Sequence, residues 1–313
     1  MYKNHRIAVV APAFNEAKLI GRVIGTIPEF VDHVIVVDDC SRDDTFAAAQ
    51  AEACGGGRVI VLQTRENGGV GCATMLGYGK ALESGAQVIV KMDGDGQMPP
   101  EYLPALLDAI IEGNYDYAKG NRFLASESLR AMPRHRIFGN IVMTFMTKLA
   151  SGYWHIFDPQ NGYTAITADA LRLLDLGEIH PRYFFENDML VHLNLRRARV
   201  KDVAMPARYG EELSSVNLFK VGVTFPLLSL RRFAKRIYQN YVLRDFSPIA
   251  LFLLLGAALF GWGFLFGAYL WIKSIVTGHP TPTGTIMLSV LPLILGFQLL
   301  LQAIVLDIQE TPK

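Results

Sequence analysis

The sequence has little cysteine and no surplus of either charge, and both shortages narrow the classes of protein that it can represent. Three of its 313 residues are cysteine (Cys40, Cys54 and Cys72), an odd number at spacings that match no metal-binding pattern. We therefore expect reduced thiols in a domain that faces the cytosol. The formal net charge is +1, whereas nucleic-acid-binding proteins carry a strong basic excess, so the composition argues against a nucleic-acid partner.

A signal-peptide pattern is also lacking at the start of the sequence. The first six residues lead directly into a strand-like apolar segment. We therefore expect the N-terminal domain to stay on the side of the membrane where it is made.

Residues 1–245 hold nearly all of the charge, and residues 246–306 contain almost no ionisable side chains. The run from Pro248 to Ile272 contains none, and about 25 helical residues reach about 37 Å, enough to cross a hydrocarbon core of ~30 Å. A second apolar run extends from Thr285 to Ile308 and is interrupted by Gln298, Gln302 and Asp307. We predict a two-helix transmembrane hairpin with a short C-terminal tail over residues 247–313; two buried helices of a large soluble core are the alternative.

The charges beside the hairpin predict its orientation. The loop between the spans has Lys273 alone, whereas five basic residues precede the first span: Arg231, Arg232, Lys235, Arg236 and Arg244. By the positive-inside rule, the N-terminal domain and the C-terminal tail face the cytosol, in a multi-pass protein of the cytoplasmic membrane. Apolar and basic residues alternate at helical spacing within residues 211–246, which favours juxtamembrane amphipathic helices at the bilayer surface over an ordinary surface helix.

Residues 1–210 show the pattern of an α/β domain, in which short apolar runs alternate with helical patterns. The expected strands are Ile7–Pro12, His33–Asp38, Val59–Gln63 and Val88–Met92, and the expected helices are Glu16–Thr26, Thr45–Ala53, Val70–Glu83 and Pro100–Glu112. Continuous Val/Ile runs are typical of a parallel sheet that is covered on both faces. Such a Rossmann-like sheet binds ligands at the carboxyl ends of its strands.

Carboxylates follow several of these strands, and their spacing predicts a metal site. In an extended segment, residues two apart point to the same side, so Asp93, Asp95 and Gln97 of the DGDGQ motif would present three oxygens to one point. Hard oxygen ligands suit Mg²⁺ or Mn²⁺. Asp38 and Asp39, at the end of another strand, belong to the same expected edge of the sheet.

Six motifs follow one another along the chain: PAFNE (12–16), DDCSRDDT (38–45), NGGVGCATMLGY (67–78), DGDGQ (93–97), GNR (120–122) and DPQNGY (158–163). In this order and spacing they resemble the family-two inverting glycosyltransferases, and the C-terminal spans are similar to those of the polyprenyl-phosphate branch, which includes dolichyl-phosphate mannosyltransferase. The resemblance covers residues 6–245 and implies a nucleotide-sugar-binding (GT-A) catalytic fold. Cys40 departs from the pattern, which usually has glycine there.

The resemblance implies roles for particular residues. Pro12, Ala13, Asn15 and Glu16 would line the nucleoside pocket, Asp39 would bind the base or ribose with Asp38 beside it, and Asp93, Asp95 and Gln97 would hold the metal on the donor diphosphate. Arg122 is placed to contact phosphate oxygens. Arg134 and Arg136 begin an apolar helical stretch and are candidates for the acceptor phosphate, with a solvated helix start as the alternative.

A phosphate acceptor needs no strong base, because its second pKa lies near ~6. Asp158 would then orient the acceptor or the sugar. Glu186 and Asp188 match the acidic motif that supplies the base in other members, so the choice of base stays open between these acids.

The predicted function is therefore metal-dependent transfer of a sugar from a UDP- or GDP-linked donor to a polyprenyl phosphate, such as undecaprenyl or dolichyl phosphate. The transfer would invert the configuration at the sugar carbon. Its product would be a lipid-linked monosaccharide at the cytosolic face of the membrane. Two other functions stay open: transfer to another lipid or lipid-linked acceptor, and nucleotide-sugar binding without catalysis. The sequence does not define the sugar, the polyprenol length or the oligomeric state, although small residues in the spans would allow contact between copies.

Overall fold

The computed structural model describes residues 1–53, 57–124, 134–206 and 218–312, with the side chains of 134–138, 218–221 and Val223 outside the description. Contacts divide the chain into two compact units, Met1–Phe233 with Pro312–Lys313, and Ala234–Thr311. The boundary falls inside one helix, so each unit is described by itself.

The first unit is built on a mixed sheet, which is seven-stranded over the described residues and has the order β3-β2-β1-β4-β6-β5-β7. Its strands are β1 (Ile7–Ala13), β2 (His33–Asp38), β3 (Val59–Gln63), β4 (Val88–Lys91), β5 (Tyr117–Asn121), β6 (Thr164–Thr167) and β7 (Val200–Ala204). The four strands expected from the Val/Ile runs pair in parallel, as predicted. Strand β6 is antiparallel to both β4 and β5, so the sheet is not parallel throughout.

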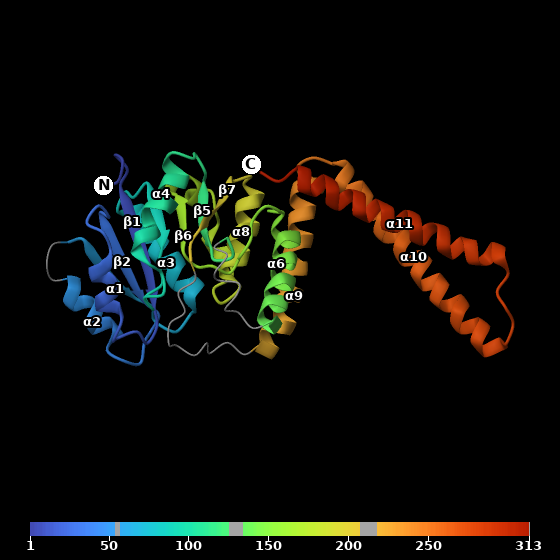
Figure 1. The fold of residues 1–313 in the computed structure, drawn as a ribbon, viewed down its shortest axis with the longest axis horizontal. Coiled ribbons are helices and arrows are strands. Elements are labelled where there is room, and N and C mark those ends of the chain that lie inside the picture. Colours follow the sequence, from blue (N-terminus) through green and yellow to red (C-terminus); the bar gives the residue numbers. More distant parts are fainter. Residues whose placement is uncertain (54–56, 125–133, 207–217, 313) are drawn as a thin grey trace. The chain divides into compact units, whose positions relative to one another are not determined.

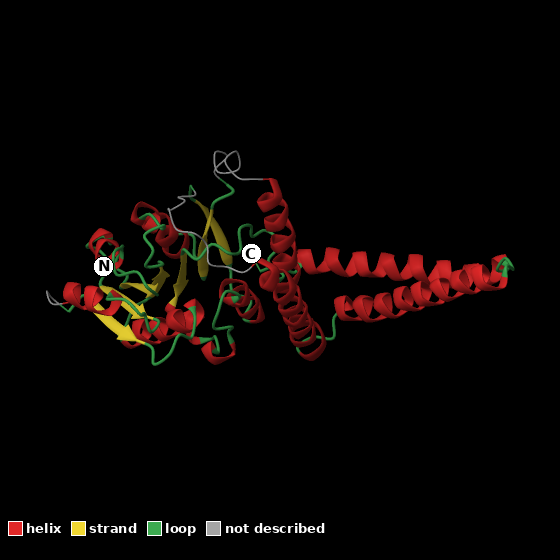
Figure 2. Ribbon diagram, turned by 90° about the horizontal axis from the view of Figure 1, so that it is seen from below, coloured by secondary structure: helices red, strands yellow, loops and turns green. Residues whose placement is uncertain are grey.

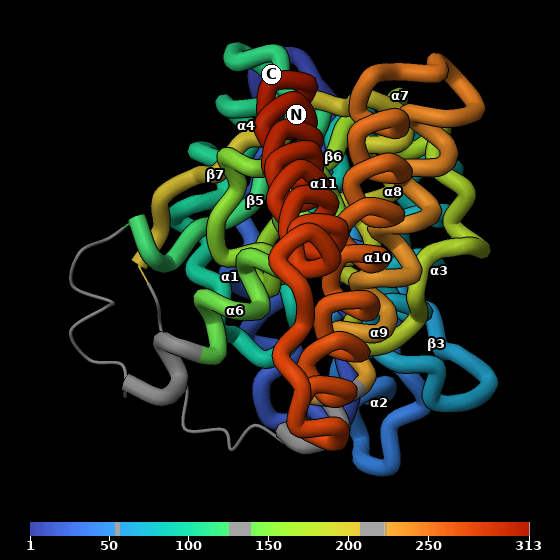
Figure 3. The backbone as a smooth tube through the Cα atoms, turned by 90° about the vertical axis from the view of Figure 1, so that its right-hand side faces the viewer, coloured from blue at the N-terminus to red at the C-terminus, as the bar shows by residue number. Residues whose placement is uncertain are grey.

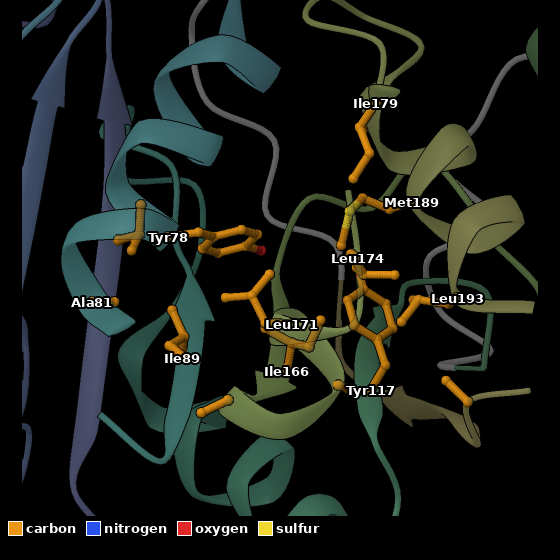
Figure 4. Packing of buried hydrophobic residues seen from close by; sticks show 14 of the residues in the cluster. Tyr78, Ala81, Ile89, Tyr117, Ile166, Leu171, Leu174, Ile179, Met189 and Leu193 are labelled. Carbon is orange, nitrogen blue, oxygen red and sulfur yellow. The ribbon is translucent and has the colours of Figure 1, made fainter. Parts of the chain in front are cut away.

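Helices cover both faces of this sheet (Figures 1 and 2). The helices before the second unit are α1 (Ile20–Thr26), α2 (Thr45–Ala53), α3 (Val70–Glu83), α4 (Leu103–Ile111) after the 3₁₀ turn η1 (Pro100–Tyr102), α6 (Arg134–Ser151), α7 (Ala168–Arg172), the 3₁₀ turn η2 (Leu176–Glu178), α8 (Phe185–Leu195) and α9 (Leu218–Ile237), and α9 crosses the boundary between the units. One buried cluster joins β1, β2 and β4 to α3 and α8. Figure 4 shows part of it, with Tyr78 of α3 and Met189 of α8 both in the cluster. A second cluster packs α1 and α4 on the opposite face.

Helix α1 begins four residues later than the sequence pattern predicts. The backbone N–H groups of Asn15, Glu16 and Ala17 donate to side chains of the loop after β2 and of the first residue of α2, instead of entering a helix. Asn15 also adopts a left-handed backbone conformation, with φ of 59°. Since left-handed residues do not continue an α-helix, the chain turns here before α1 starts.

The second unit contains the π-helical turn η3 (Tyr238–Leu243) and two long helices, α10 (Pro248–Thr277) and α11 (Thr283–Gln309). Both are long and apolar enough to span a membrane, and 22% and 17% of their most apolar windows are buried within the structure. Large apolar side chains are exposed along them, as at Trp271 (73%) and Val276 (79%). A core helix of a soluble protein would be mostly buried, whereas these two helices leave most of their apolar surface exposed within the structure.

The two long helices pack against each other through small residues. The loop that joins them faces the viewer in Figure 3. A β-carbon added at Gly256 would lie 3.1 Å from the carbonyl oxygen of Gly296, and one added at Gly263 would lie 2.6 Å from that of Ser289. Gly256 and Gly263 therefore allow α10 and α11 to pack closely against each other. They are among the small residues of the spans that would also allow contact between copies of the chain.

A buried ion pair ties the second unit together at its basic end. The Arg236 guanidinium donates to both carboxylate oxygens of Asp307, at 2.6 and 3.0 Å, and the hydroxyl of Tyr241 donates to the same carboxylate at 2.6 Å. Arg236 has no exposed surface and Asp307 is 5% exposed. Asp307, which interrupts the second apolar run in the sequence, is thus neutralised by a cation from the segment before the first span.

Candidate active site

The loops after β1 and β2 interlock at the carboxyl edge of the sheet. Asn15 Oδ1 accepts a hydrogen bond from the backbone N–H of Arg42 at 2.8 Å, and the backbone N–H of Asn15 donates to the Ser41 hydroxyl at 2.8 Å. Cys40 is left-handed with φ of 56°, a conformation that glycine adopts at least cost. This explains why the resembling family usually has glycine at the position.

Asp38 and Asp39 are both buried, and both hold neighbouring loops. Asp38 accepts from the Ser41 hydroxyl and, at 2.8 Å, from the Gln63 amide. The two oxygens of Asp39 accept from the backbone N–H groups of Gly68 (3.0 Å) and Gly69 (2.7 Å). The glycines of the NGG segment therefore provide the donors that offset this carboxylate, and Asp39 shapes the wall of the adjoining pocket.

This pocket opens between the loops after β1, β2 and β3 and has a volume of about 640 Å³. It is lined by Phe14, Cys40, Ser41, Arg42, Arg65, Glu66, Asn67 and Arg182. Three guanidinium groups against one carboxylate favour an anionic ligand. The expected nucleoside residues Pro12 and Ala13 are buried in β1 behind it, whereas Phe14, which the sequence argument passed over, lies on the pocket wall and is 41% exposed.

The DGDGQ segment follows β4 and turns instead of continuing as a strand. Gly96 has φ of 72°, and Asp95 Oδ1 accepts from the backbone N–H of Gln97 at 2.9 Å. The argument from side chains alternating along an extended segment was therefore wrong for this motif. Asp93, Asp95 and Gln97 are nevertheless all partly exposed, so their oxygens remain accessible from solvent.

Among the described residues, no three His, Cys, Asp or Glu side chains gather as a metal-binding group. The predicted metal set has a different composition, two carboxylates and one amide oxygen within five residues. These hard donors fit Mg²⁺ or Mn²⁺, which commonly take only one or two carboxylates from a protein and complete their shell with substrate phosphates. The residues present therefore fit the expected ion.

Lys91 is a charged residue of this site that the sequence argument missed. Its Nζ has no exposed surface and lies 2.6 Å from Asp93 Oδ1 and 3.3 Å from Glu186 Oε1. Burial alone would lower the pKa of Lys91, but the two carboxylates hold this pKa above its ordinary value. The pKa of Glu186 is raised, mainly by burial of its carboxyl group. The positive charge of Lys91 lowers this pKa, and the negative charge of Asp93 raises it. The sequence did contain a signal for this residue, because Lys91 is a single charged residue at the end of the apolar run Val88–Lys91.

Gly162 of the DPQNGY motif gives this lysine its space. A β-carbon at Gly162 would lie 2.6 Å from Lys91 Nζ and 3.0 Å from Asp93 Oδ2. The carbonyl oxygen of Gly162 also accepts from Lys91 Nζ at 3.4 Å. The motif therefore contacts the DGDGQ segment through a buried cation.

Arg122 and Asp158 form a two-pronged ion pair. Arg122 Nε donates to Asp158 Oδ2 and Arg122 Nη2 donates to Oδ1, both at 2.8 Å, and the backbone N–H of Arg122 adds a third bond at 3.1 Å. Burial would raise the pKa of Asp158, but these Arg122 bonds outweigh it and lower the pKa below its ordinary value. The Asp158 carboxylate is 3% exposed and Arg122 is 38% exposed, so the arginine reaches solvent while the acid orients it.

The remaining candidates lie in different surroundings. Glu186 and Asp188 are both in the first turn of α8, but Asp188 is fully buried and pairs with Arg232 of α9 at 2.6 Å. It therefore lies in the packing between two helices, whereas Glu186 reaches Lys91. Arg134 and Arg136 lie at the start of α6, and their side chains are outside the described part of the structure.

Comparison with known proteins gives a consistent set of relatives. The sequence profile of glycosyl transferase family 2 matches residues 8–174. A UDP-N-acetylglucosamine–dolichyl-phosphate N-acetylglucosaminyltransferase of Methanococcus voltae is 29% identical over 218 residues, which cover 66% of this chain and 86% of the relative. A polyprenol monophosphomannose synthase of Mycolicibacterium smegmatis is 33% identical over 190 residues, which cover 59% of this chain and 70% of the relative.

Among solved structures, glucosyl-3-phosphoglycerate synthase from Mycobacterium tuberculosis, in complex with Mn²⁺, uridine diphosphate and glucosyl-3-phosphoglycerate, matches with a TM-score of 0.54. The match covers 74% of this chain and 80% of that chain at 20% sequence identity. At this identity the likeness concerns the fold alone.

Proposed function

Because the chain belongs to glycosyl transferase family 2, we propose that it transfers a sugar from a nucleotide-diphosphate sugar to a polyprenyl phosphate, with inversion, at the cytosolic face of the cytoplasmic membrane. One observation carries the acceptor assignment: the family domain shares its chain with two long apolar helices whose surfaces are mostly exposed. The names of the two relatives, one for dolichyl phosphate and one for a polyprenol monophosphate, support the same class of acceptor.

The donor site in this proposal combines the arginine-lined pocket with the DGDGQ segment. Arg42, Arg65 and Arg182 surround a pocket large enough for a nucleotide, and their fixed fork of donors suits diphosphate and base oxygens. The donor is UDP- or GDP-linked. Pro12, Ala13, Asn15, Glu16, Asp38 and Asp39 contribute by fixing the walls of this pocket.

Asp93, Asp95 and Gln97 would hold Mg²⁺ or Mn²⁺ beside the diphosphate. When bound, the cation supplies positive charge against the diphosphate leaving group. Lys91 places a second, permanent cation behind Asp93 at 2.6 Å. In this assignment the lysine fixes the carboxylate that faces the donor.

The acceptor needs orientation more than deprotonation. A lipid phosphate carries a second pKa near ~6, so its attacking oxygen is largely ionised at neutral pH. Arg122, oriented by Asp158, contacts phosphate oxygens, and Arg134 and Arg136 bind the acceptor phosphate. A single in-line displacement at the sugar carbon then inverts the configuration, without a covalent intermediate.

If the acceptor required a base, Glu186 would be the better placed of the two acids in α8. Glu186 lies 3.3 Å from Lys91, beside the DGDGQ segment, and burial raises the pKa of its carboxyl. Asp188 is held by Arg232 and by the backbone N–H of His180 at 2.8 Å. We therefore assign Asp188 to positioning.

The test uses the full-length protein in detergent with labelled UDP- and GDP-linked sugars, Mn²⁺, and either undecaprenyl phosphate or undecaprenol. We expect a labelled lipid product of inverted configuration from the phosphate and none from the alcohol. Equal glycosylation of the alcohol would overturn the acceptor assignment. Nucleotide binding without any transfer would instead favour a binding protein.

A further inference from the structure

Helix α9 is joined to the first turn of α8 by a buried ion pair. Arg232 Nη2 donates to Asp188 Oδ2 at 2.6 Å and to the carbonyl oxygen of Glu178 at 2.9 Å. The Asp188 side chain has no exposed surface and that of Arg232 is 17% exposed. Removing one partner of such a pair leaves a buried charge uncompensated, so the positions of the two helices are coupled at this point.

An aromatic contact accompanies the ion pair. The rings of Phe184, just before α8, and Phe225 of α9 meet edge to face with centroids 4.9 Å apart. Phe225, Ser229 and Arg232 lie on the covered side of α9, whereas Leu230 (62%) and Arg231 are exposed. The exposed side therefore carries the apolar and basic residues that suit a bilayer surface, and the covered side contacts the catalytic unit.

The same turn of α8 reaches the donor site. Glu186, two residues before Asp188, lies 3.3 Å from Lys91 Nζ, and Lys91 lies 2.6 Å from Asp93. The segment before α8 contacts the other side of the site, because the carbonyl oxygen of Pro181 accepts from the backbone N–H of Cys72 at 3.0 Å. Arg182 also donates to the carbonyl oxygen of Asn67, in the wall of the pocket, at 3.2 Å.

We propose that Arg232 is a positioning residue. Through Asp188 it sets the position of α8, and thereby the positions of Glu186, Lys91 and Asp93. Donor binding then depends on the position of α9 against α8. This deepens the proposed function and rests on it for the identity of the donor. Arg232 touches neither substrate in this view. It transmits the position of a membrane-surface helix to the donor site.

The chain offers a matched control in Arg231. It is adjacent to Arg232, carries the same charge and is exposed. Arg231→Ala removes one positive charge from the membrane-facing side without removing the contact to α8. Any effect shared by the two variants therefore reports surface charge, and an effect of Arg232→Ala alone reports the position of α8.

The experiment measures the affinity of the full-length protein for Mn²⁺-UDP and Mn²⁺-GDP and, separately, the KM for undecaprenyl phosphate and kcat. We expect Arg232→Ala to weaken binding of the preferred nucleotide by about 5-fold or more, the lower range for coupled sites, and to lower kcat. Arg231→Ala should leave nucleotide affinity unchanged and raise only the KM for the lipid. Asp188→Asn should resemble Arg232→Ala, the double variant should be no worse than either, and Arg232→Lys should recover part of the affinity.

Thermal unfolding of each variant checks that it folds. If Arg232→Ala does not fold, Arg232→Lys, which keeps the charge, and Asp188→Asn, which keeps side-chain size, carry the comparison. Unchanged nucleotide affinity in folded Arg232 and Asp188 variants would overturn the proposal, as would equal effects of the Arg231 and Arg232 substitutions. Because nucleotide binding is read without any acceptor, these outcomes are distinct from a failure of the wild type to glycosylate the lipid phosphate.

Discussion

Replacing Lys91 by methionine tests the buried cation at the centre of the site. The substitution keeps length and apolar volume but leaves the Asp93 and Glu186 carboxylates facing each other. Breaking a buried ion pair by removing one partner costs about 3–5 kcal/mol. Asp93 is 27% and Glu186 13% exposed, so water reduces the penalty, and we expect a loss at the lower end, about 3 kcal/mol. For a domain of this size the loss corresponds to a Tm lower by about 6–12 °C.

The same variant should respond more strongly to a divalent cation. In the wild type, Lys91 already offsets part of the negative charge, whereas in Lys91→Met an ion bound at Asp93 would relieve the repulsion between the two carboxylates. Thermal unfolding with and without Mn²⁺ should therefore show a larger Mn²⁺-induced rise in Tm for Lys91→Met than for the wild type. Sugar transfer should fall sharply, because Asp93 loses its fixed partner.

Lys119 provides the control for this experiment. It is also buried, at 1% exposure, and pairs with Asp202 at 3.1 Å on β5 and β7, away from the DGDGQ segment. Lys119→Met should lower Tm by a comparable amount without enlarging the response to Mn²⁺. The reasoning is refuted if both lysine variants respond equally to Mn²⁺, or if Lys91→Met keeps wild-type stability and transfer.

Three further outcomes follow from the site. Asp95→Ala should abolish transfer while Tm stays within a few degrees of the wild type. A chelator should inhibit the wild type until Mg²⁺ or Mn²⁺ is restored. Full activity in excess chelator would exclude the metal role. The folded-state pKa of Asp158 is lowered, so its contribution to stability is fully present above the ordinary value of 3.8 and is lost as pH falls through the lower folded value. Unfolding free energies at a series of pH values should therefore show Asp158→Asn less stable than the wild type at neutral pH, with the difference shrinking in acid, whereas a constant difference would contradict the Arg122 pairing. Gly162→Ala should displace Lys91 Nζ and reduce kcat, because the new β-carbon would lie 2.6 Å from Lys91 Nζ and 3.0 Å from Asp93 Oδ2; normal turnover in this variant would contradict the role of Lys91 in fixing Asp93.

The sequence pattern predicted the first half of the catalytic fold because continuous Val and Ile runs that alternate with helical patterns allow few alternatives. Strands β1 to β4 were expected within one residue of their observed bounds, and the GT-A-like α/β fold is confirmed. Strands β5, β6 and β7 were not predicted, since YAKGN, TAIT and VKDVA are short and lack a strong apolar run. Such segments become strands through their neighbours in the sheet, which local patterns do not contain.

The candidate site was predicted in its motifs more than in its contacts. The sequence predicted carboxylates at one edge of the sheet, and like charges gathered there need a nearby cation. It did not identify Lys91 as a cation of this edge, because Glu186 reaches that lysine only through the packing of α8 against the sheet. Likewise, two acids two residues apart, Glu186 and Asp188, look equivalent in sequence but face different partners.

The buried pair of Arg236 and Asp307 changes the electrostatic account of how this protein meets a lipid surface. Counting along the sequence gives five basic residues before the first span, but Arg236 is neutralised by Asp307 and Arg232 by Asp188. Pairing therefore removes two of the five cations from the attraction to anionic headgroups; of the other three, Arg231 and Arg244 are exposed and Lys235 is half-buried. At about 1 kcal/mol for each basic residue near the surface, the attraction is weaker by about 2 kcal/mol than the sequence count implies. Retention in a bilayer should accordingly depend little on ionic strength and chiefly on the apolar surface of α10 and α11.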